Sequence, residues 1–332
     1  MYHPRLYGTF YEMGLKYGKL LYEKAGFQIP AMSVEKENVG RQSYPLLKAF
    51  YPEVIEEIDG FAAGIQADGE KLAAFLLSIG LFEQTGQCSV FAYKEKEQVF
   101  VGRNYDMLFA FKKFTESSLI VPDNRFAAIT QSDVFIGRVD GINEKGLFMA
   151  MSFVNGKATQ PGINFYFIIR KVLEDCATTQ EAIDLLMPVE VSSASNFMIA
   201  DRTGDLAVVE SAPEKKYVRR PESHYIYMTN QFISEEMKAL DIGGIAWSKS
   251  QERYTGLTDR LEQVDRMTLA KAKAILSDDC ICLNLKKQQF GTLWSVVANL
   301  SDLTIERAES KPTTKNFKPE TRLAWWLNKQ KS

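Results

Sequence analysis

TGQCSVFAYKEKEQVFVGRNYDM, residues 85–107, marks a change in the hydrophobic period of the chain. Before it, apolar side chains recur at helical spacing. Within it, SVFAY and QVFVGR are apolar or alternating runs, rich in β-branched and aromatic residues and separated by the charged turn KEKE. This pattern predicts an antiparallel hairpin. Cys88 would then stand at the start of the first strand.

Residues 1–87 are expected to form a helical unit. Apolar side chains recur there every three or four residues, as on the buried face of an amphipathic helix. Gly14 and Gly18 lie one helical turn apart, which would let a neighbouring helix approach closely. We therefore divide the chain into a helical N-terminal segment, 1–87, which is a pro-region or a small subunit, and a domain of residues 88–332. The helical stretches are 10–20, 46–61 and 72–81.

Short strand patterns and helical patterns alternate after the hairpin. This order predicts an α+β protein with two antiparallel sheets, packed face to face and covered by helices, in which residues 196–229 supply a second antiparallel set. The expected strands are 118–121, 126–130, 135–139, 147–153, 196–200, 206–210, 217–219, 225–229, 292–300 and 303–310. The expected helices are 165–176, 179–187, 248–261 and 268–276.

The composition is that of an ordinary globular protein. Of 332 residues, 45% are hydrophobic, which suffices for a large core. Forty basic and 42 acidic side chains give a net charge of −2, without a long run of one sign. Neither nucleic acid nor an anionic membrane is therefore an expected partner. The sequence shows no signal-peptide core and no apolar stretch of about 18 residues, so we expect a cytoplasmic protein.

No metal or other cofactor is expected. Four cysteines are too few and too unevenly spaced for a disulfide framework. Cys280 and Cys282 form a C-x-C pair, but their neighbourhood, DDCICLNLKK, contains no histidine to complete a zinc site. The chain also lacks the phosphate-loop, dinucleotide, zinc-protease and serine-hydrolase motifs.

Cys88 is a candidate nucleophile, although a bland buried cysteine is the more common role for this residue type. A cysteine attacks as a thiolate, so it needs a group that accepts its proton. The two histidines, His3 and His224, lie near the start of the chain and at the head of an expected strand. If Cys88 is the nucleophile, the favoured base is its own α-amine, which has a pKa of roughly 7.7–8.0. That amine exists only if the bond between Gln87 and Cys88 is cut.

The order of several motifs resembles the choloylglycine hydrolase group of N-terminal-nucleophile hydrolases. Within that group the chain is similar to the acyl-coenzyme A:6-aminopenicillanic acid acyltransferase branch, in which a helical segment precedes the cysteine. The resemblance implies a four-layer αββα sandwich and self-cleavage after Gln87. The motifs are CS, GRNYDM, DGINEKGLFMAMSF, SNFMIADRTGDLAVVES, the TN of YMTNQF, SKSQERY and FGTLWSVVANL.

The resemblance assigns roles to residues around the nucleophile. It implies that Cys88 attacks the substrate, that Asp106 contacts the new amine, and that Arg103 holds the thiolate and the carboxylate. Simple electrostatics agrees, because a buried guanidinium stabilises a nearby thiolate. The alternative is that Arg103 and Asp106 form a structural ion pair at a strand end.

The resemblance also implies groups that stabilise the oxyanion. Asn230 matches the asparagine whose side chain helps to form the oxyanion hole, and Arg253 matches a second arginine of the active site. Without the resemblance, these residues would be a turn asparagine and a solvated helix charge. A second oxyanion-hole donor would come either from Asn155 or from a backbone amide near Phe153.

The implied activity is hydrolysis of a linear amide, such as an N-acyl amide, a penicillin or a bile-salt conjugate, through a thioester. The expected partner is a small N-acyl amide with a hydrophobic acyl group. The resemblance implies this, because the apolar stretches MLFAFKKF, 107–114, and DIGGIAW, 241–247, match the pocket loops of the family. The alternative is that their aromatic side chains belong to the core. Two alternatives stay open: an acyl-coenzyme A-dependent N-acyltransferase, and an uncleaved binding protein without catalysis. Association of identical chains also stays open.

Overall fold

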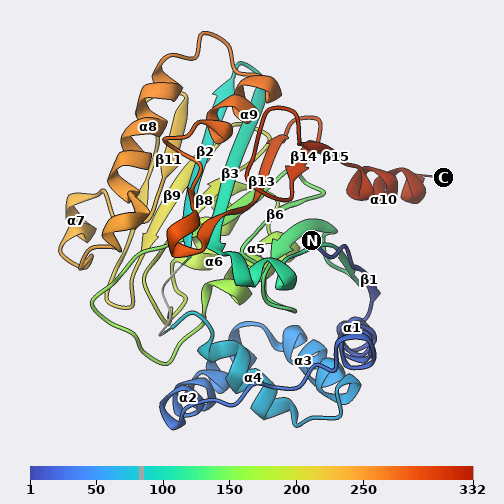
Figure 1. Ribbon diagram of the computed structural model, residues 1–332. Coiled ribbons are helices and arrows are strands. Elements are labelled where there is room, and N and C mark those ends of the chain that lie inside the picture. The colour runs from blue at the N-terminus through green and yellow to red at the C-terminus, as the bar shows by residue number, and fades with distance from the viewer. Residues whose placement is uncertain (82–85, 332) are drawn as a thin grey trace.

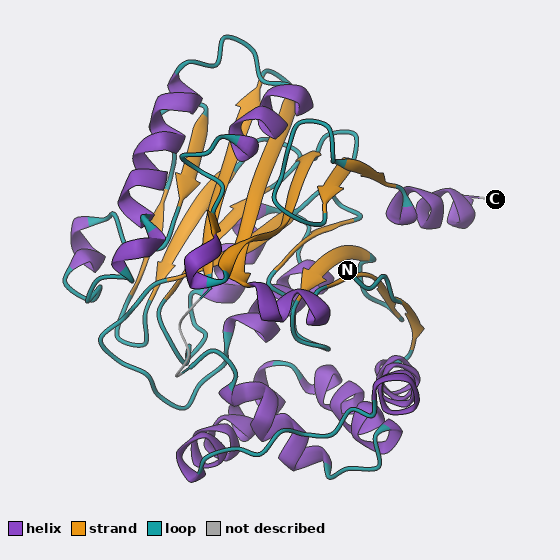
Figure 2. Cartoon of the chain, viewed as in Figure 1, coloured by secondary structure: helices purple, strands orange, loops and turns teal. Residues whose placement is uncertain are grey.

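The computed structural model describes residues 1–81 and 86–331. Its larger part consists of two facing sheets with helices on both outer faces, and four N-terminal helices lie beside this part (Figures 1 and 2). The α+β class and the two mainly antiparallel sheets predicted from the sequence are confirmed.

The first sheet has eight strands in the order β1-β4-β5-β6-β7-β8-β9-β10. All neighbours are antiparallel except β1 and β4, which are parallel. Its strands are β1 (Arg5–Gly8), β4 (Glu116–Pro122), β5 (Ala128–Ser132), β6 (Asp140–Asn143), β7 (Phe148–Phe153), β8 (Ser195–Ala200), β9 (Leu206–Ser211) and β10 (Lys216–Arg219).

The second sheet has seven strands in the order β11-β2-β3-β13-β14-β15, with β12 paired to β13. The predicted hairpin is its centre, since β2 pairs with β3 in antiparallel register. The predicted second set does not hold together, because β8 to β10 extend the first sheet whereas β11 pairs with β2. The strands are β2 (Gln87–Glu95), β3 (Gln98–Leu108), β11 (Tyr225–Met228), β12 (Asn284–Leu285), β13 (Phe290–Asn299), β14 (Thr304–Ala308) and β15 (Lys318–Glu320).

Helices complete the four layers. The second sheet is covered by α8 (Ser250–Glu262) and α9 (Leu269–Ser277), and the first by α5 (Phe165–Asp175) and α6 (Thr179–Leu186). The main apolar core lies between the sheets and continues to the N-terminal helices, while a second cluster lies beneath α8 and α9. The shorter elements are α7 (Glu235–Lys238), α10 (Arg322–Lys331) and the 3₁₀ turns η1 (Phe109–Phe114), η2 (Ala246–Ser248) and η3 (Lys286–Gln288).

Small residues let two N-terminal helices touch through their backbones. A Cβ atom built on Gly14 would lie 2.0 Å from the carbonyl oxygen of Glu57, and one on Gly18 would lie 2.4 Å from that of Phe61. The predicted close approach of a neighbouring helix is therefore confirmed. The four helices are α1 (Phe10–Ala25), α2 (Val34–Phe50), α3 (Pro52–Gly64) and α4 (Gly69–Ser78).

Replacing Gly18 with alanine is expected to destabilise the protein. The added methyl group would meet backbone atoms, which cannot rotate away, so α1 and α3 must move apart. Overpacking of this kind costs about 1–3 kcal/mol. Chemical unfolding of Gly18→Ala should show this loss, whereas Lys19→Ala, on the exposed side of the same helix, should unfold like the parent.

Two further sequence predictions differ from the structure. Residues 135–139, expected as a strand, form bends in which Ile136 has a φ of +68°. Buried arginines fix this conformation, since Arg170 donates to the Ile136 carbonyl and Arg138 to that of Gly137. The N-terminal segment is also not purely helical, because β1 pairs with β4 and so ties the start of the chain to the first sheet.

Among the described residues, no helix is both long and apolar enough to cross a membrane.

Candidate active site

Cys88 lies between the two sheets, near the start of β2. Side chains alternate between the faces of a strand, so Cys88 and its cross-strand partner Tyr105 face the first sheet. Gln87 and Ser89 face the opposite side, where α8 lies. The Cys88 side chain is fully buried. Cys88 was predicted to be the first residue of a strand, and it is the second residue of β2.

Arg103 is the charged group that contacts the sulfur. Its Nη2 donates to Cys88 Sγ at 3.3 Å and to the Met151 carbonyl at 3.2 Å. Its Nη1 donates to the Val139 carbonyl at 2.7 Å and to the carboxylate of Asp140. A fully buried guanidinium is therefore held against the thiol by contacts from the first sheet.

The carboxylate paired with Arg103 is that of Asp140, not Asp106. Residues 103 and 106 are three apart on β3, so their side chains point to opposite faces of the sheet. Asp106 accepts a hydrogen bond from Thr292 on the neighbouring strand instead. The alternative that Arg103 and Asp106 form a structural ion pair is therefore wrong. Arg103 pairs with Asp140 instead, and this ion pair joins the two sheets.

Asp140 belongs to a buried network that the sequence analysis did not identify. Trp294 Nε1 donates to Asp140 Oδ2 at 3.2 Å, and the Trp294 ring stacks on Tyr105 with centroids 3.9 Å apart. This stacking connects the partner of Arg103 with the cross-strand neighbour of Cys88. The sequence did contain a signal for this role, because Asp140 is the only acidic residue in the run FIGRVDGIN. A charged side chain in a buried strand requires a partner of opposite charge.

The pKa of the Cys88 thiol reflects two opposing effects. Burial raises it most, and the charge of Asp106 also raises it, whereas Arg103, through its charge and its hydrogen bond, and the charge of Arg253 lower it. Burial has the larger effect, so the pKa is raised. The thiol therefore needs both the guanidinium and a proton acceptor to react near neutral pH.

Asp106 lies opposite Gln87 on the neighbouring strand and has one carboxylate oxygen without a hydrogen bond among the described residues. It pairs across the hairpin with Gln87, and its Oδ1 accepts from Thr292 Oγ1 at 2.5 Å. Its Oδ2 is buried and has no hydrogen-bond partner among the described residues. Burial raises the pKa of Asp106 to about 6, against the lowering effects of Arg253, Thr292 and Arg103.

We expect Asp106 to make the uncut protein less stable as the pH rises. Its folded pKa of about 6 exceeds the unfolded reference value of 3.8. Ionisation therefore destabilises the fold progressively between these values, by up to about 3 kcal/mol above pH 6. Chemical unfolding should show that Asp106→Asn in a Cys88→Ala background gains stability over its parent at pH 7 but not at pH 4. Equal differences at both pH values would contradict the raised pKa.

Asn230, just after β11, binds the chain on both sides of residue 87. Its Oδ1 accepts from the backbone N–H of Cys88 at 2.9 Å. Its Nδ2 donates to the carbonyls of Phe153 at 2.9 Å and Gly86 at 3.5 Å. Ser250 Oγ accepts from the Asn230 backbone N–H at 2.9 Å, which connects this asparagine to the first residue of α8.

Arg253 projects from α8 onto residues 87–89. Its Nη1 donates to the Cys88 carbonyl at 2.5 Å and to Ser89 Oγ at 3.0 Å. Its Nη2 donates to Gln87 Oε1 at 3.0 Å and to Asn230 Oδ1 at 2.9 Å. The side chain is fully buried, and burial lowers its pKa. Arg253 is therefore not a solvated helix charge, the role expected of an isolated arginine at this position.

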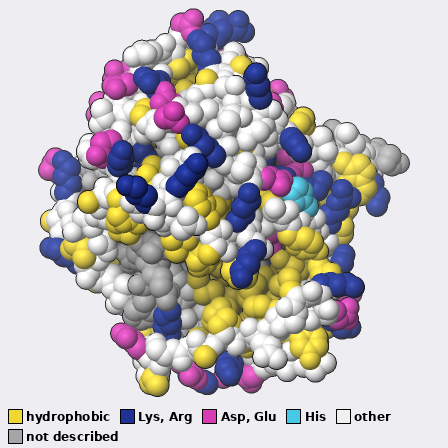
Figure 3. Space-filling model, viewed as in Figure 1, with side chains coloured by type: hydrophobic (Ala, Val, Ile, Leu, Met, Phe, Trp, Pro, Cys, Tyr) yellow, Lys and Arg dark blue, Asp and Glu magenta, His cyan; other side chains and the backbone are white. Residues whose placement is uncertain are grey.

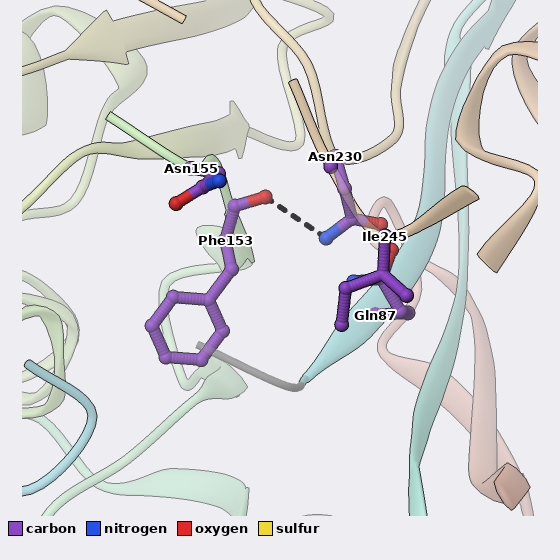
Figure 4. Close-up of a pocket in the computed structure, with 6 residues that line it drawn as sticks. Gln87, Phe153, Asn155, Asn230 and Ile245 are labelled. Atoms are coloured by element: carbon purple, nitrogen blue, oxygen red, sulfur yellow. Dashed lines mark hydrogen bonds between the residues drawn. The ribbon is translucent and has the colours of Figure 1, made fainter. Parts of the chain in front are cut away.

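Asn155 borders a small cavity but its amide is engaged elsewhere. The cavity has a volume of about 80 Å³ (Figure 4). Asn155 Nδ2 donates to the Gly243 carbonyl at 2.7 Å, and Val154 N–H donates to the Ala194 carbonyl at 3.4 Å. The Asn155 side chain and the Val154 N–H therefore have acceptors in the continuous chain. The lining residues are Gln87, Phe153, Asn155, Asn230, Gly244 and Ile245.

Asn196 is a further residue that sequence reasoning missed. Its Nδ2 donates to the carbonyls of Thr229 at 3.2 Å and Gln231 at 3.0 Å, the two neighbours of Asn230. It also donates to Ser152 Oγ at 3.3 Å. This amide thus fixes the position of Asn230 from the first sheet. It stands in the quoted SNFMIADRTGDLAVVES, but its role depends on contacts that spacing does not reveal.

The two cysteines of the C-x-C pair lie in different environments. Cys280 is exposed and Cys282 is buried, with its sulfur 3.9 Å from the carbonyl oxygen of Ser277. In the described parts of the chain, no group of three or more histidine, cysteine, aspartate or glutamate side chains could hold a metal ion.

A family comparison matches most of the second part of the chain. A model of the family described as acyl-coenzyme A:6-aminopenicillanic acid acyl-transferase matches residues 93–314, more than half of the chain. The matched range begins after Cys88 and includes the other five candidate residues. No curated protein sequence matches the chain.

Three solved structures are similar to the chain at low sequence identity. A variant of the conjugated bile acid hydrolase from Clostridium perfringens has a TM-score of 0.54 and 15% identity, over 70% of this chain and 92% of that one. An orthologue of N-acylethanolamine-hydrolyzing acid amidase from Caenorhabditis elegans has a TM-score of 0.48 and 19% identity, over 64% and 93%. Penicillin V acylase from Agrobacterium tumefaciens has a TM-score of 0.45 and 18% identity, over 68% and 84%. The first of these likenesses supports the fold of two facing sheets covered by helices.

Proposed function

The chain belongs to the acyl-coenzyme A:6-aminopenicillanic acid acyl-transferase family, and on this premise we propose that it is a self-processing cysteine amidohydrolase. The proposed nucleophile is Cys88, and the proposed substrates are small linear amides. The similar fold of a conjugated bile acid hydrolase is consistent with hydrolysis of such a bond.

One observation carries the proposal: side chains from three separate elements converge on residues 86–88. Arg103 from β3 contacts the sulfur of Cys88. Asn230 from the end of β11 contacts its backbone N–H, and Arg253 from α8 contacts its carbonyl oxygen. A buried structural cysteine does not require three polar groups around its own peptide bond, because such groups cost free energy to bury.

In the proposed maturation, Cys88 Sγ attacks the carbonyl carbon of Gln87. The C–N bond breaks, the thiol proton passes to the nitrogen, and a thioester and a free α-amine are formed. Water then hydrolyses the thioester, which leaves residues 1–87 with a terminal carboxylate. The orphan oxygen of Asp106 is available to accept a hydrogen bond from the new amine.

In the proposed turnover, the α-amine takes the thiol proton and the thiolate attacks the substrate carbonyl. Arg103 stabilises the thiolate. The Asn230 N–H that binds Gly86 in the continuous chain becomes free to donate to the oxyanion once residue 86 has moved away. The amine protonates the leaving group, and water releases the acid from the thioester.

We propose a hydrophobic acyl group for the substrate. The two apolar stretches noted in the sequence both reach the start of β13. The ring of Trp247 lies edge-on to that of Phe290, with the ring centroids 4.9 Å apart, and Phe109 lies beside Gly291. Figure 3 shows hydrophobic side chains in a hollow between the N-terminal helices and the rest of the molecule. Aliphatic acyl amides should therefore be better substrates than acetyl amides of the same amine.

Acyl transfer is a second candidate function, because the family is described by a transferase activity. Hydrolysis and transfer pass through the same thioester and differ only in whether water or an amine attacks it. The discriminating measurement is product formation from matched N-acyl amides, with and without acyl-coenzyme A and a free amine. Turnover that requires the thioester donor would replace hydrolysis by transfer.

Denaturing mass spectrometry tests the maturation directly. Purified protein should yield fragments of residues 1–87 and 88–332, with a free amino group on Cys88. A single intact species of 37.6 kDa that still hydrolyses amides at full rate would contradict the mechanism. An intact and inactive species would favour a binding protein.

A further inference from the structure

The side chain of Gln87, the residue before the candidate nucleophile, is buried beside the polar side chains of Arg253 and Asn230. It lies on the α8 side of β2, is 4% exposed, and forms part of the lining of the cavity shared with Asn230 and Ile245 (Figure 4). Its Oε1 accepts a hydrogen bond from Arg253 Nη2 at 3.0 Å. The residue that would be cut from the nucleophile therefore places an acceptor oxygen on a fully buried arginine.

Departure of Gln87 would leave one donor of Arg253 without a partner. The other contacts of this guanidinium go to groups that stay in place after cleavage, namely Ser248, Cys88, Ser89 and Asn230. Arg253 forms no ion pair with a carboxylate in the described parts of the chain. A buried donor that loses its acceptor is costly, so the matured site favours a ligand that supplies another acceptor.

The proposed maturation also makes Gln87 the first acyl group carried by the enzyme. The thioester formed with Cys88 Sγ contains the Gln87 carbonyl, and an acyl-enzyme from an external amide would contain the substrate carbonyl at the same sulfur. Counted from that carbonyl carbon, the acceptor oxygen of Gln87 is attached to the fifth carbon. The hydrogen bond from Arg253 thus shows how far from the reacting carbonyl carbon an acyl group must carry its acceptor oxygen.

We infer that Arg253 is a specificity-determining residue, which selects acyl groups carrying a carbonyl or carboxylate oxygen on the fifth carbon. This inference rests on the proposed self-cleavage and adds a polar requirement to the proposed apolar acyl site. Glutaryl-type acyl groups meet the requirement, and unsubstituted alkanoyl groups of similar length do not. Carbons beyond the acceptor remain free to contact apolar side chains.

The alternative is that Gln87 is only a buried strand residue whose amide needs a partner. That role would be fulfilled by any nearby backbone carbonyl or N–H group. It does not require a buried arginine whose other Nη hydrogen bonds go to Cys88, to Ser89 beside it, and to Asn230. The alternative also predicts no relation between residue 87 and substrate choice.

The first test compares three p-nitroanilides that share one leaving group: glutaryl, 5-amino-5-oxopentanoyl and hexanoyl. The matured enzyme should prefer the better of the two oxygen-bearing acyl groups over hexanoyl by about 10- to 100-fold in kcat/KM. Arg253→Lys should lower all rates but bring this ratio close to one, because an ammonium group lacks the planar pair of donors. Equal rates on all three substrates in the matured parent would overturn the inference.

The second test uses the chain as its own substrate. Gln87→Leu keeps a buried side chain of similar size but removes the acceptor, and should slow self-cleavage about tenfold or more. Gln98→Leu is the matched control, since Gln98 is exposed at the start of β3, and should mature at the parent rate. Time courses of fragment formation measure both.

The two tests separate the inference from the function on which it rests. A parent chain that never cleaves itself refutes the proposed function and the inference together. A parent that matures while Gln87→Leu matures equally fast refutes the inference alone. A matured enzyme that hydrolyses none of the three anilides leaves the decision to the self-cleavage rates.

Discussion

Replacing Cys88 with alanine should abolish both self-cleavage and amide hydrolysis. Without the sulfur, neither thioester can form, and the loss should be ~10⁴-fold or more, as for other nucleophiles that act as part of a catalytic unit. Intact mass should show one uncut chain, and amide turnover should fall to background. The fold should persist, because alanine fits within the volume that the cysteine occupied.

Cys176→Ala is the matched control for this experiment. Cys176 is also buried and follows α5, but it has no arginine against its sulfur in the described structure. Burial raises its pKa to about 12, so it should not react as a thiolate near neutral pH. The control should mature and hydrolyse amides like the parent. Normal processing of Cys88→Ala, or loss of processing in Cys176→Ala, would contradict the assignment of the nucleophile.

Local patterns in the sequence predicted much of the fold. The change of period at residues 85–107 predicted the hairpin because alternation of side chains is a property of the strand itself. Gly14 and Gly18 predicted a close helix contact for an equally local reason. The error at 135–139 has a non-local cause: Arg170, far along the chain, binds the Ile136 carbonyl and stabilises bends where apolar residues alone favour a strand.

Partners across the fold were harder to predict than the residues themselves. Arg103 was identified, and the structure places it against Cys88. Its carboxylate partner, Asp140, comes from the other sheet, and no spacing rule relates two residues that meet only when sheets pack. The same holds for Asn196, which binds the two neighbours of Asn230 from the first sheet. Thr292 faces Asp106 across adjacent strands of one sheet, and that pairing depends on the order of the strands.

Asp140→Asn should lower the reactivity of Cys88, although residue 140 acts on Cys88 only through Arg103. The substitution keeps the size of the side chain but removes the negative charge that orients Arg103. Loss of one partner from a buried ion pair costs about 3–5 kcal/mol of stability. Since Arg103 opposes the rise in the pKa of Cys88, a less ordered guanidinium should raise this pKa further, by about one unit or more. The rate at pH 7 should fall about 10- to 100-fold and recover partly at alkaline pH.

A second buried ion pair separates this effect from simple loss of stability. Arg138 and Glu116 are joined at 2.8 Å and are both buried, but neither contacts Cys88. Glu116→Gln should therefore lower stability without shifting the pH dependence of thiol alkylation, which is followed at Cys88 by peptide mass spectrometry because Cys280 is exposed. Asp140→Glu should restore part of the lost rate. If Asp140→Asn and Glu116→Gln alter stability alike and leave the same alkylation profile, Asp140 stabilises the fold but does not position Arg103 for catalysis.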